Sequence, residues 1–128
     1  VDNVTLEGYE FSSRVLRPGD TLTVTLTWRA RGPISGQYTS FAHLLDAGFN
    51  TRGGHDAALE PATSDWAPGQ LITDIHTFEV AAGAAPGVYQ IEVGLYSQPD
   101  MSRLMLVNSR GAEGADRVLL GPLRVEAP

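Results

Sequence analysis

Apolar and polar residues alternate with a period of two along much of this chain. In residues 21–28, Leu, Val, Leu and Trp occupy one set of positions and four threonines occupy the other. Residues 88–96 repeat the pattern, with Tyr89, Ile91, Val93 and Leu95 on one face. Successive side chains of a strand point to opposite faces, so both segments are predicted strands with one buried face. The threonine face is typical of a solvated β surface.

Turn signals divide the rest of the chain into further short strands. They are predicted at residues 4–11, 38–46, 103–107 and 117–126, with another between the turns at 66–69 and 85–87. The segment 38–46 is apolar on both faces, which predicts a central strand. Pro122 lacks an amide donor, so its strand is expected to be an edge strand or to contain a bulge. We predict an all-β, Ig-like antiparallel β-sandwich of seven to nine strands, as a single domain over residues 1–128.

Residues 47–65 show no clear period and are expected to form the longest loop, with at most one helical turn at 57–60. Long loops often carry function, so His55, Asp56, Asp65 and the adjoining Trp66 are the candidate ligand-binding residues. An exposed Trp beside an acidic residue offers a flat apolar surface on which a sugar ring can stack. The alternative interpretations are that Trp66 packs beneath the loop and that His55 and Asp56 anchor it by hydrogen bonds.

Histidines and acids elsewhere raise the possibility of a metal site. His43, Asp74 and His76 are secondary candidates, and the alternative is that each is a hydrogen-bonded residue of a strand. A zinc site needs three or four converging ligands, which this pattern does not provide, so no metal and no cofactor are predicted. The chain has no Cys, and all nine of its basic residues are Arg. It also lacks a G-x-S-x-G motif, and we predict that the fragment itself is not an enzyme.

The formal net charge of -6 argues against a nucleic-acid partner, because phosphate binding requires clustered basic residues. No apolar run approaches the roughly 20 residues of a membrane span, so no membrane insertion by this fragment is expected. The chain begins at Val1 without an initiator Met, and we expect it to be excised from a larger chain.

Several motifs in a fixed order resemble a known family. They are Gly8-Tyr9 with Phe11, Pro18-Gly19-Asp20, Phe41 with His43-Leu44, His55-Asp56, Thr63 with Trp66-Ala67-Pro68-Gly69, Asp74, Pro86-Gly87-Val88-Tyr89 and Val93-Gly94-Leu95-Tyr96. Together they resemble the extracytoplasmic β-sandwich domain at the C-terminus of some bacterial polytopic membrane glycosyltransferases. Those enzymes are similar to the dolichyl-phosphate-mannose protein mannosyltransferases.

The resemblance implies a non-catalytic accessory domain that positions a glycan or protein acceptor. It also implies an extracytoplasmic location, periplasmic or at the cell surface, as part of a bacterial membrane protein. The partners it implies are carbohydrate or the membrane portion of the parent enzyme. Within the shared motifs, Asp20 and Asp74 are expected to accept hydrogen bonds from backbone amides near strand ends.

Two other functions stay open. The first is a freestanding carbohydrate-binding module that uses Trp66, Asp65, His55 and Asp56. The second is a small metal-dependent hydrolase that uses His43, Asp74 and His76.

Overall fold

The computed structural model describes residues 2–97, 100–106 and 115–128. These residues form eight strands and one short 3₁₀ turn. The elements are β1 (Val4–Phe11), β2 (Val15–Leu16), β3 (Thr21–Ala30), β4 (Tyr38–Leu45), β5 (Thr51–Ala58), η1 (Thr63–Asp65), β6 (Leu71–Glu79), β7 (Gly87–Ser97) and β8 (Val118–Val125). The predicted Ig-like β-sandwich is confirmed.

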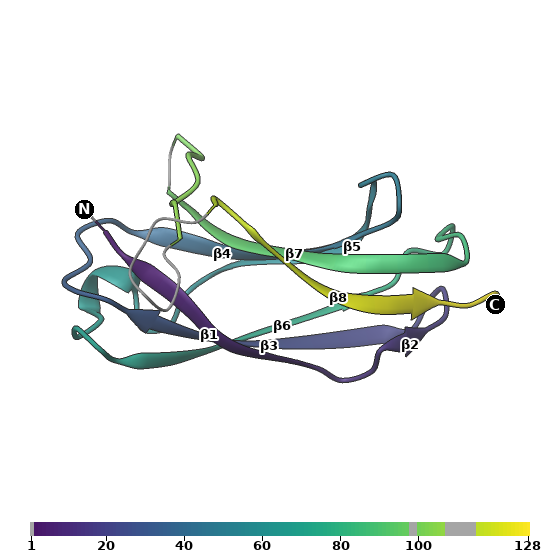
Figure 1. Cartoon of the computed structure of the whole chain (residues 1–128), viewed down its shortest axis with the longest axis horizontal. Coiled ribbons are helices and arrows are strands. Elements are labelled where there is room, and N and C mark those ends of the chain that lie inside the picture. The colour runs from purple at the N-terminus through teal and green to yellow at the C-terminus, as the bar shows by residue number, and fades with distance from the viewer. Residues whose placement is uncertain (1, 98–99, 107–114) are drawn as a thin grey trace.

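The strands lie in two layers packed face to face (Figure 1). One sheet has three strands in the order β1-β3-β6, and the other has five in the order β2-β8-β7-β4-β5. Neighbouring strands are antiparallel apart from β2, whose two residues pair in parallel with the end of β8. The central position predicted for residues 38–46 is confirmed, because β4 lies between β7 and β5.

The core lies between the sheets and follows the alternation of the sequence. In β3, every second residue from Leu22 to Ala30 is buried, and Trp28 has no exposed surface. In β7, the buried set is Tyr89, Ile91, Val93 and Leu95. Because a one-residue slip would turn these side chains toward solvent, the apolar period determines which face of each strand packs inward.

The prediction of an irregular segment at residues 47–65 was wrong in its central part. Residues 51–58 form β5, an edge strand that pairs with β4, and residues 57–60 contain no helical turn. β5 lacks the apolar alternation of β3 and β7. Backbone hydrogen bonds to β4 and close approach to β6 hold it in place instead. A Cβ on Gly53 would lie 2.7 Å from the Glu79 carbonyl oxygen, and one on Gly54 would lie 2.7 Å from the His43 ring.

The last predicted strands are only partly as expected. Pro122 lies in β8 where the register with β7 shifts between Tyr89 and Ile91, so the expected bulge is present. The strand predicted at residues 103–107 is not formed in its described part. Residues 103–106 make a single bridge, between Arg103 and Tyr96 of β7. Residue 107, which completes the predicted strand 103–107, lies outside the described residues.

Candidate functional site

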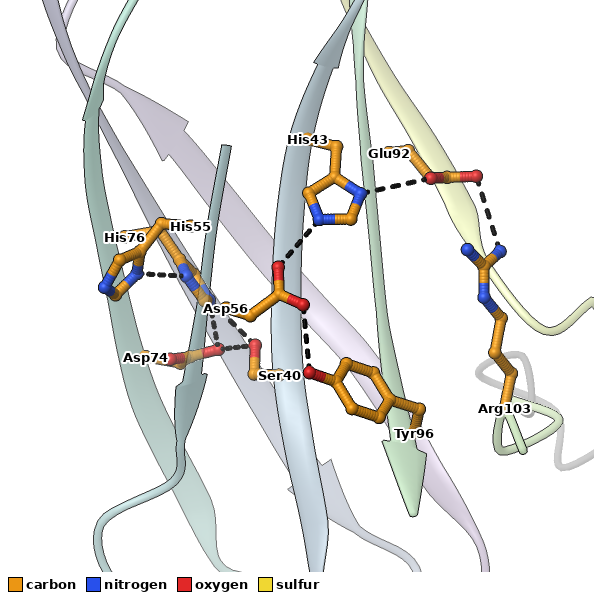
Figure 2. Close-up of polar contacts among 9 residues, drawn as sticks. All are labelled: Ser40, His43, His55, Asp56, Asp74, His76, Glu92, Tyr96 and Arg103. Carbon is orange, nitrogen blue, oxygen red and sulfur yellow. Dashed lines mark hydrogen bonds and ion pairs between the residues drawn. The ribbon is translucent and has the colours of Figure 1, made fainter. Parts of the chain in front are cut away.

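Polar side chains gather on both sides of β4, and Figure 2 shows most of them. The inner polar cluster lies between the two sheets and consists of Trp28, Ser40, His55, Asp74 and His76. The outer-face cluster lies on the far side of the five-stranded sheet and consists of Phe41, His43, Asp56, Glu92, Tyr96, Arg103 and Arg117.

The alternation of strand residues creates these two clusters from neighbouring positions. His55 and Asp56 are adjacent on β5, yet His55 bonds to His76 of the opposite sheet, whereas Asp56 bonds to His43 and Tyr96. The hypothesis that His55 and Asp56 form one loop-borne site was therefore wrong. Consecutive side chains of a strand leave on opposite faces and cannot contact the same ligand.

Asp74 is the centre of the inner polar cluster. Its Oδ2 accepts hydrogen bonds from Trp28 Nε1 at 3.0 Å and from the Ser40 hydroxyl, and His76 Nε2 lies 3.0 Å away. Burial by itself would raise the pKa of Asp74, but hydrogen bonds from His76, Ser40 and Trp28 outweigh it and lower the pKa. The expectation that Asp74 binds backbone amides was wrong, since its partners are side chains. Asp20 does accept from a backbone amide, that of Arg17 at 2.8 Å.

The inner polar cluster has the composition of a Ser-His-Asp triad but not its geometry. A triad places the acid on one imidazole nitrogen and the serine on the other. Here Ser40 Oγ, at 2.7 Å, and Asp74 Oδ2 both contact Nε2 of His76, while Nδ1 contacts His55 Nδ1 at 2.9 Å. Ser40 and His76 have no exposed surface, so the hydroxyl is closed to a substrate. The cluster joins the two sheets and has no activated nucleophile.

On the outer face, Asp56 lies between a histidine and a tyrosine. His43 Nε2 lies 2.7 Å from Asp56 Oδ1, and the Tyr96 hydroxyl donates to Asp56 Oδ2 at 2.9 Å (Figure 2). Burial and the hydrogen bond and charge of Asp56 raise the pKa of Tyr96, so its hydroxyl remains a donor. These contacts hold Asp56 in one orientation while its side chain stays 38% exposed.

Glu92 continues the outer-face cluster beyond His43. Its Oε1 lies 3.6 Å from His43 Nδ1, and its Oε2 accepts from Arg117 Nη1 at 2.6 Å and from Arg103 Nη1 at 3.4 Å. Burial alone would raise the pKa of Glu92, but Arg117, Arg103 and His43 together lower it. The side chain is only 8% exposed, whereas the two arginines are more than a third exposed, so the guanidinium groups are the accessible part.

An aromatic ring supports this surface. Phe41 points outward from β4 but is only 1% exposed, because the Arg103 guanidinium lies over its ring at 4.6 Å from the centroid. Gly94 lies beneath the ring, where an added Cβ would be 2.7 Å from Phe41 Cζ. Stacking on the ring restricts Arg103, which reduces the entropy that the side chain loses when a ligand binds.

Trp66 does not take part in either cluster. It is 3% exposed, lies in the hydrophobic core, and donates from Nε1 to the Pro61 carbonyl oxygen at 2.9 Å. The hypothesis of an exposed stacking residue was wrong, and the alternative of packing beneath the loop is confirmed. Asp65 lies in η1 and is exposed, away from both clusters.

The secondary metal candidates do not converge. His43 lies on the outer face, whereas Asp74 and His76 lie between the sheets and bond directly to each other. Across the described residues, no group of three His, Asp or Glu side chains is arranged to hold a metal ion. The candidate ligand set of His43, Asp74 and His76 was therefore wrong, because the five-stranded sheet lies between His43 and the other two residues.

Sequence reasoning missed Ser40, Glu92, Tyr96, Arg103 and Arg117. A local signal existed for two of them: Glu92 and Tyr96 occupy the outward positions of the predicted strand 88–96, on the face of Asp56. The arginines carried no such signal, because they come from the connection between β7 and β8.

Comparison with known proteins establishes the fold. No protein-family model and no curated protein matches the sequence. The fold is similar to the C-terminal domain of wzt, with a TM-score of 0.58 and 11% identity over 96% of this chain and 73% of that one. It is also similar to a Niemann-Pick type C2 protein from Japanese carpenter ant, with a TM-score of 0.55 and 10% identity over 98% of this chain and 93% of that one. At these identities the likeness concerns the fold alone, an Ig-like β-sandwich.

Proposed function

We propose that this chain is a non-catalytic accessory domain that binds glycan through the outer-face cluster. The observation that carries the proposal is the continuous chain of contacts from Tyr96 through Asp56 and His43 to Glu92 and the two arginines. It presents oriented donors and acceptors on an open sheet face, outside the core.

The chemistry of the cluster suits a polyhydroxylated ligand. Sugar hydroxyls both donate and accept, and the exposed parts of His43, Asp56, Arg103 and Arg117 offer both functions within one surface. Two carboxylates offset two guanidinium groups, so the cluster has no strong excess of one charge that would select a polyanion. Ion pairs on this surface orient the polar groups before a ligand arrives, which reduces the cost of binding.

The parent protein is proposed to be a bacterial membrane glycosyltransferase, with this domain outside the cytoplasmic membrane. The order of the motifs from Gly8-Tyr9 to Val93-Gly94-Leu95-Tyr96 supports this assignment. Among the described residues, no helix has the length and apolar character of a membrane span. In this arrangement the domain holds an acceptor glycan near an active site located elsewhere in the parent enzyme.

A freestanding carbohydrate-binding module is the second candidate. It rests on the same contacts of the outer-face cluster, which orient polar groups through residues of this domain. The two candidates share the binding site and differ in what the site serves. Deleting the domain from a parent glycosyltransferase would abolish or redirect transfer only in the first case.

A glycan-array screen of the domain, followed by calorimetric titration of the glycans that bind, tests the proposal. Asp56→Asn removes the charge that holds His43 and Tyr96, and we expect it to weaken binding about tenfold, which is about 1.4 kcal/mol. Glu7→Gln is the matched control, since Glu7 pairs with Arg29 and Arg31 on the other sheet. The absence of any bound glycan, or equal affinity in Asp56→Asn, would contradict the proposal.

A further inference from the structure

A shallow hollow of about 350 Å³ lies on the same face of the five-stranded sheet as the outer-face cluster. Its floor and walls come from β7, β8 and the turn between β4 and β5. The lining residues are Asp46, Ala47, Phe49, Val88, Gln90, Leu119, Gly121 and Pro122. None of them belongs to the outer-face cluster, so the hollow is a separate feature of this surface.

The hollow and the outer-face cluster adjoin each other along β7. Glu92 of the cluster and Gln90 of the hollow are successive outward residues of this strand, and Glu92 pairs with Leu119 across the ladder to β8. Arg117 reaches toward both features: its Nη1 bonds to Glu92 Oε2 at 2.6 Å, and its Cζ lies 5.8 Å from the centroid of the Phe49 ring. One ligand lying along β7 would contact both.

The hollow differs from the cluster in its chemistry. Its exposed surface is largely apolar, with Phe49 57% exposed, Val88 58% and Leu119 37%. Two polar side chains line the hollow. The Asp46 carboxylate already accepts hydrogen bonds from Asn50 and Arg52, whereas the side-chain amide of Gln90 makes no hydrogen bond within the described part of the chain. An acetamido group combines a methyl with an amide, and it matches this pairing of apolar surface with one primary amide better than a hydroxyl does.

We propose that the hollow and the outer-face cluster form one elongated site for an oligosaccharide, with a 2-acetamido sugar held in the hollow. This inference rests on the proposed glycan-binding function and specifies its ligand. From Tyr96 to Val88 the strand covers eight residue steps, or roughly 26 Å at about 3.3 Å per step. That length exceeds a single sugar ring several times over, so the site is suited to the interior of a chain.

The test uses two series of β1→4-linked oligosaccharides, one of N-acetylglucosamine and one of glucose, each from the monosaccharide to the hexasaccharide. The two series differ only in the acetamido or hydroxyl group at the second carbon. Calorimetric titration should show affinity rising with length over the first few units in the acetamido series. The longer acetamido oligomers should bind about tenfold or more tightly than glucose oligomers of equal length.

Val88→Ser removes apolar surface from the hollow, and Gln90→Leu removes its side-chain amide. Each should reduce the preference for the acetamido series about tenfold. Ile75→Ser is the matched control, because Ile75 is as exposed as Val88, at 58%, but lies on β6 of the other sheet. Changes to the hollow should leave the affinity for glucose oligomers unaltered.

The outcomes separate this inference from the proposed function. Equal affinity for the two series, or full affinity for a monosaccharide, would overturn the inference while glycan binding at the outer-face cluster stands. Failure of the acetamido series beside binding of other glycans on the array would also overturn the inference alone. Failure of every glycan would overturn the proposed function and the inference together.

Discussion

At the scale of single residues, the inner polar cluster shows how a buried carboxylate is accommodated in this fold. The Ser40 hydroxyl uses its one hydrogen to donate a hydrogen bond to Asp74. At its contact with His76 Nε2, Ser40 Oγ can therefore only accept a hydrogen bond. His76 therefore carries a proton on Nε2. Within the described residues, no buried side-chain nitrogen or oxygen lacks a hydrogen-bond partner, so the cluster is satisfied without solvent.

Asp74→Asn should reduce the free energy of unfolding by about 3 kcal/mol, because hydrogen bonds to a buried charged acceptor are replaced by weaker ones to an amide. Urea unfolding followed by tryptophan fluorescence measures the loss. Asp65→Asn is the control, since Asp65 is exposed in η1 and should change stability little. A stability for Asp74→Asn equal to that of the control would show that the cluster contributes little to stability.

At the scale of elements, β4 and β7 approach closely on the outer face because residue 94 is a glycine, which has no side chain. Phe41 is paired with Gly94 across the ladder, and its ring occupies the space that a Cβ on Gly94 would need. Arg103 covers the other side of the ring. The aromatic support of the candidate site therefore depends on glycine at this position.

Gly94→Ala should destabilise the protein by about 1–3 kcal/mol, the usual cost of overpacking a close contact. The displaced Phe41 ring would also shift Arg103, so glycan affinity should fall. Gly8→Ala is the control from another strand, because a Cβ there would meet nothing within 4 Å. Thermal unfolding and calorimetric titration of both variants measure the two effects. A neutral Gly94→Ala variant would contradict this account of the Phe41 contact.

At the scale of the whole molecule, carboxylates stabilise the fold at three separate places. Asp2 accepts from the Ser35 and Gly36 amides and the Tyr38 hydroxyl, Asp74 lies between the sheets, and Glu92 lies on the outer face. For each, burial alone would raise the pKa, but hydrogen bonds lower it, and at Glu92 the neighbouring arginines lower it further. The native structure is thus coupled to the ionised state of all three.

The free energy of unfolding should fall as the pH drops below about 4, the ordinary pKa of these groups. In that range the unfolded chain binds protons that the folded protein, with its lower pKa values, does not yet bind, so stability decreases toward acid. The contribution is fully present above the unfolded pKa and disappears as the pH falls through the folded values. Urea unfolding over a series of pH values measures it.

The double variant Asp74→Asn/Glu92→Gln removes two of the three carboxylates. Its stability should be lower at neutral pH and should depend less steeply on pH below about 4. An unchanged slope in the double variant would contradict the assignment of the acid dependence to these residues.

The fold was largely predictable from the sequence, whereas the candidate site was only partly so. The strand at residues 21–28 and the inward face of β7 followed from the apolar period because burial of one face requires it. The strand at residues 4–11 followed from the turn signals that divide the chain. The edge strand β5 was missed, since backbone pairing and glycine contacts hold it where the apolar period is absent. His43 and Asp56 were named as candidates, but their contact was not predicted.

The sequence by itself determined the inward faces of β3 and β7, because alternation with a period of two places every second side chain of a strand on one face. Only the tertiary structure decided which polar residues meet. Strand order and register place Asp56 of β5 beside His43 of β4 and separate it from the adjacent His55. They also bury Trp66, whose position beside Asp65 and a turn had favoured exposure. These contacts join residues far apart in the chain, and no local period encodes such distances.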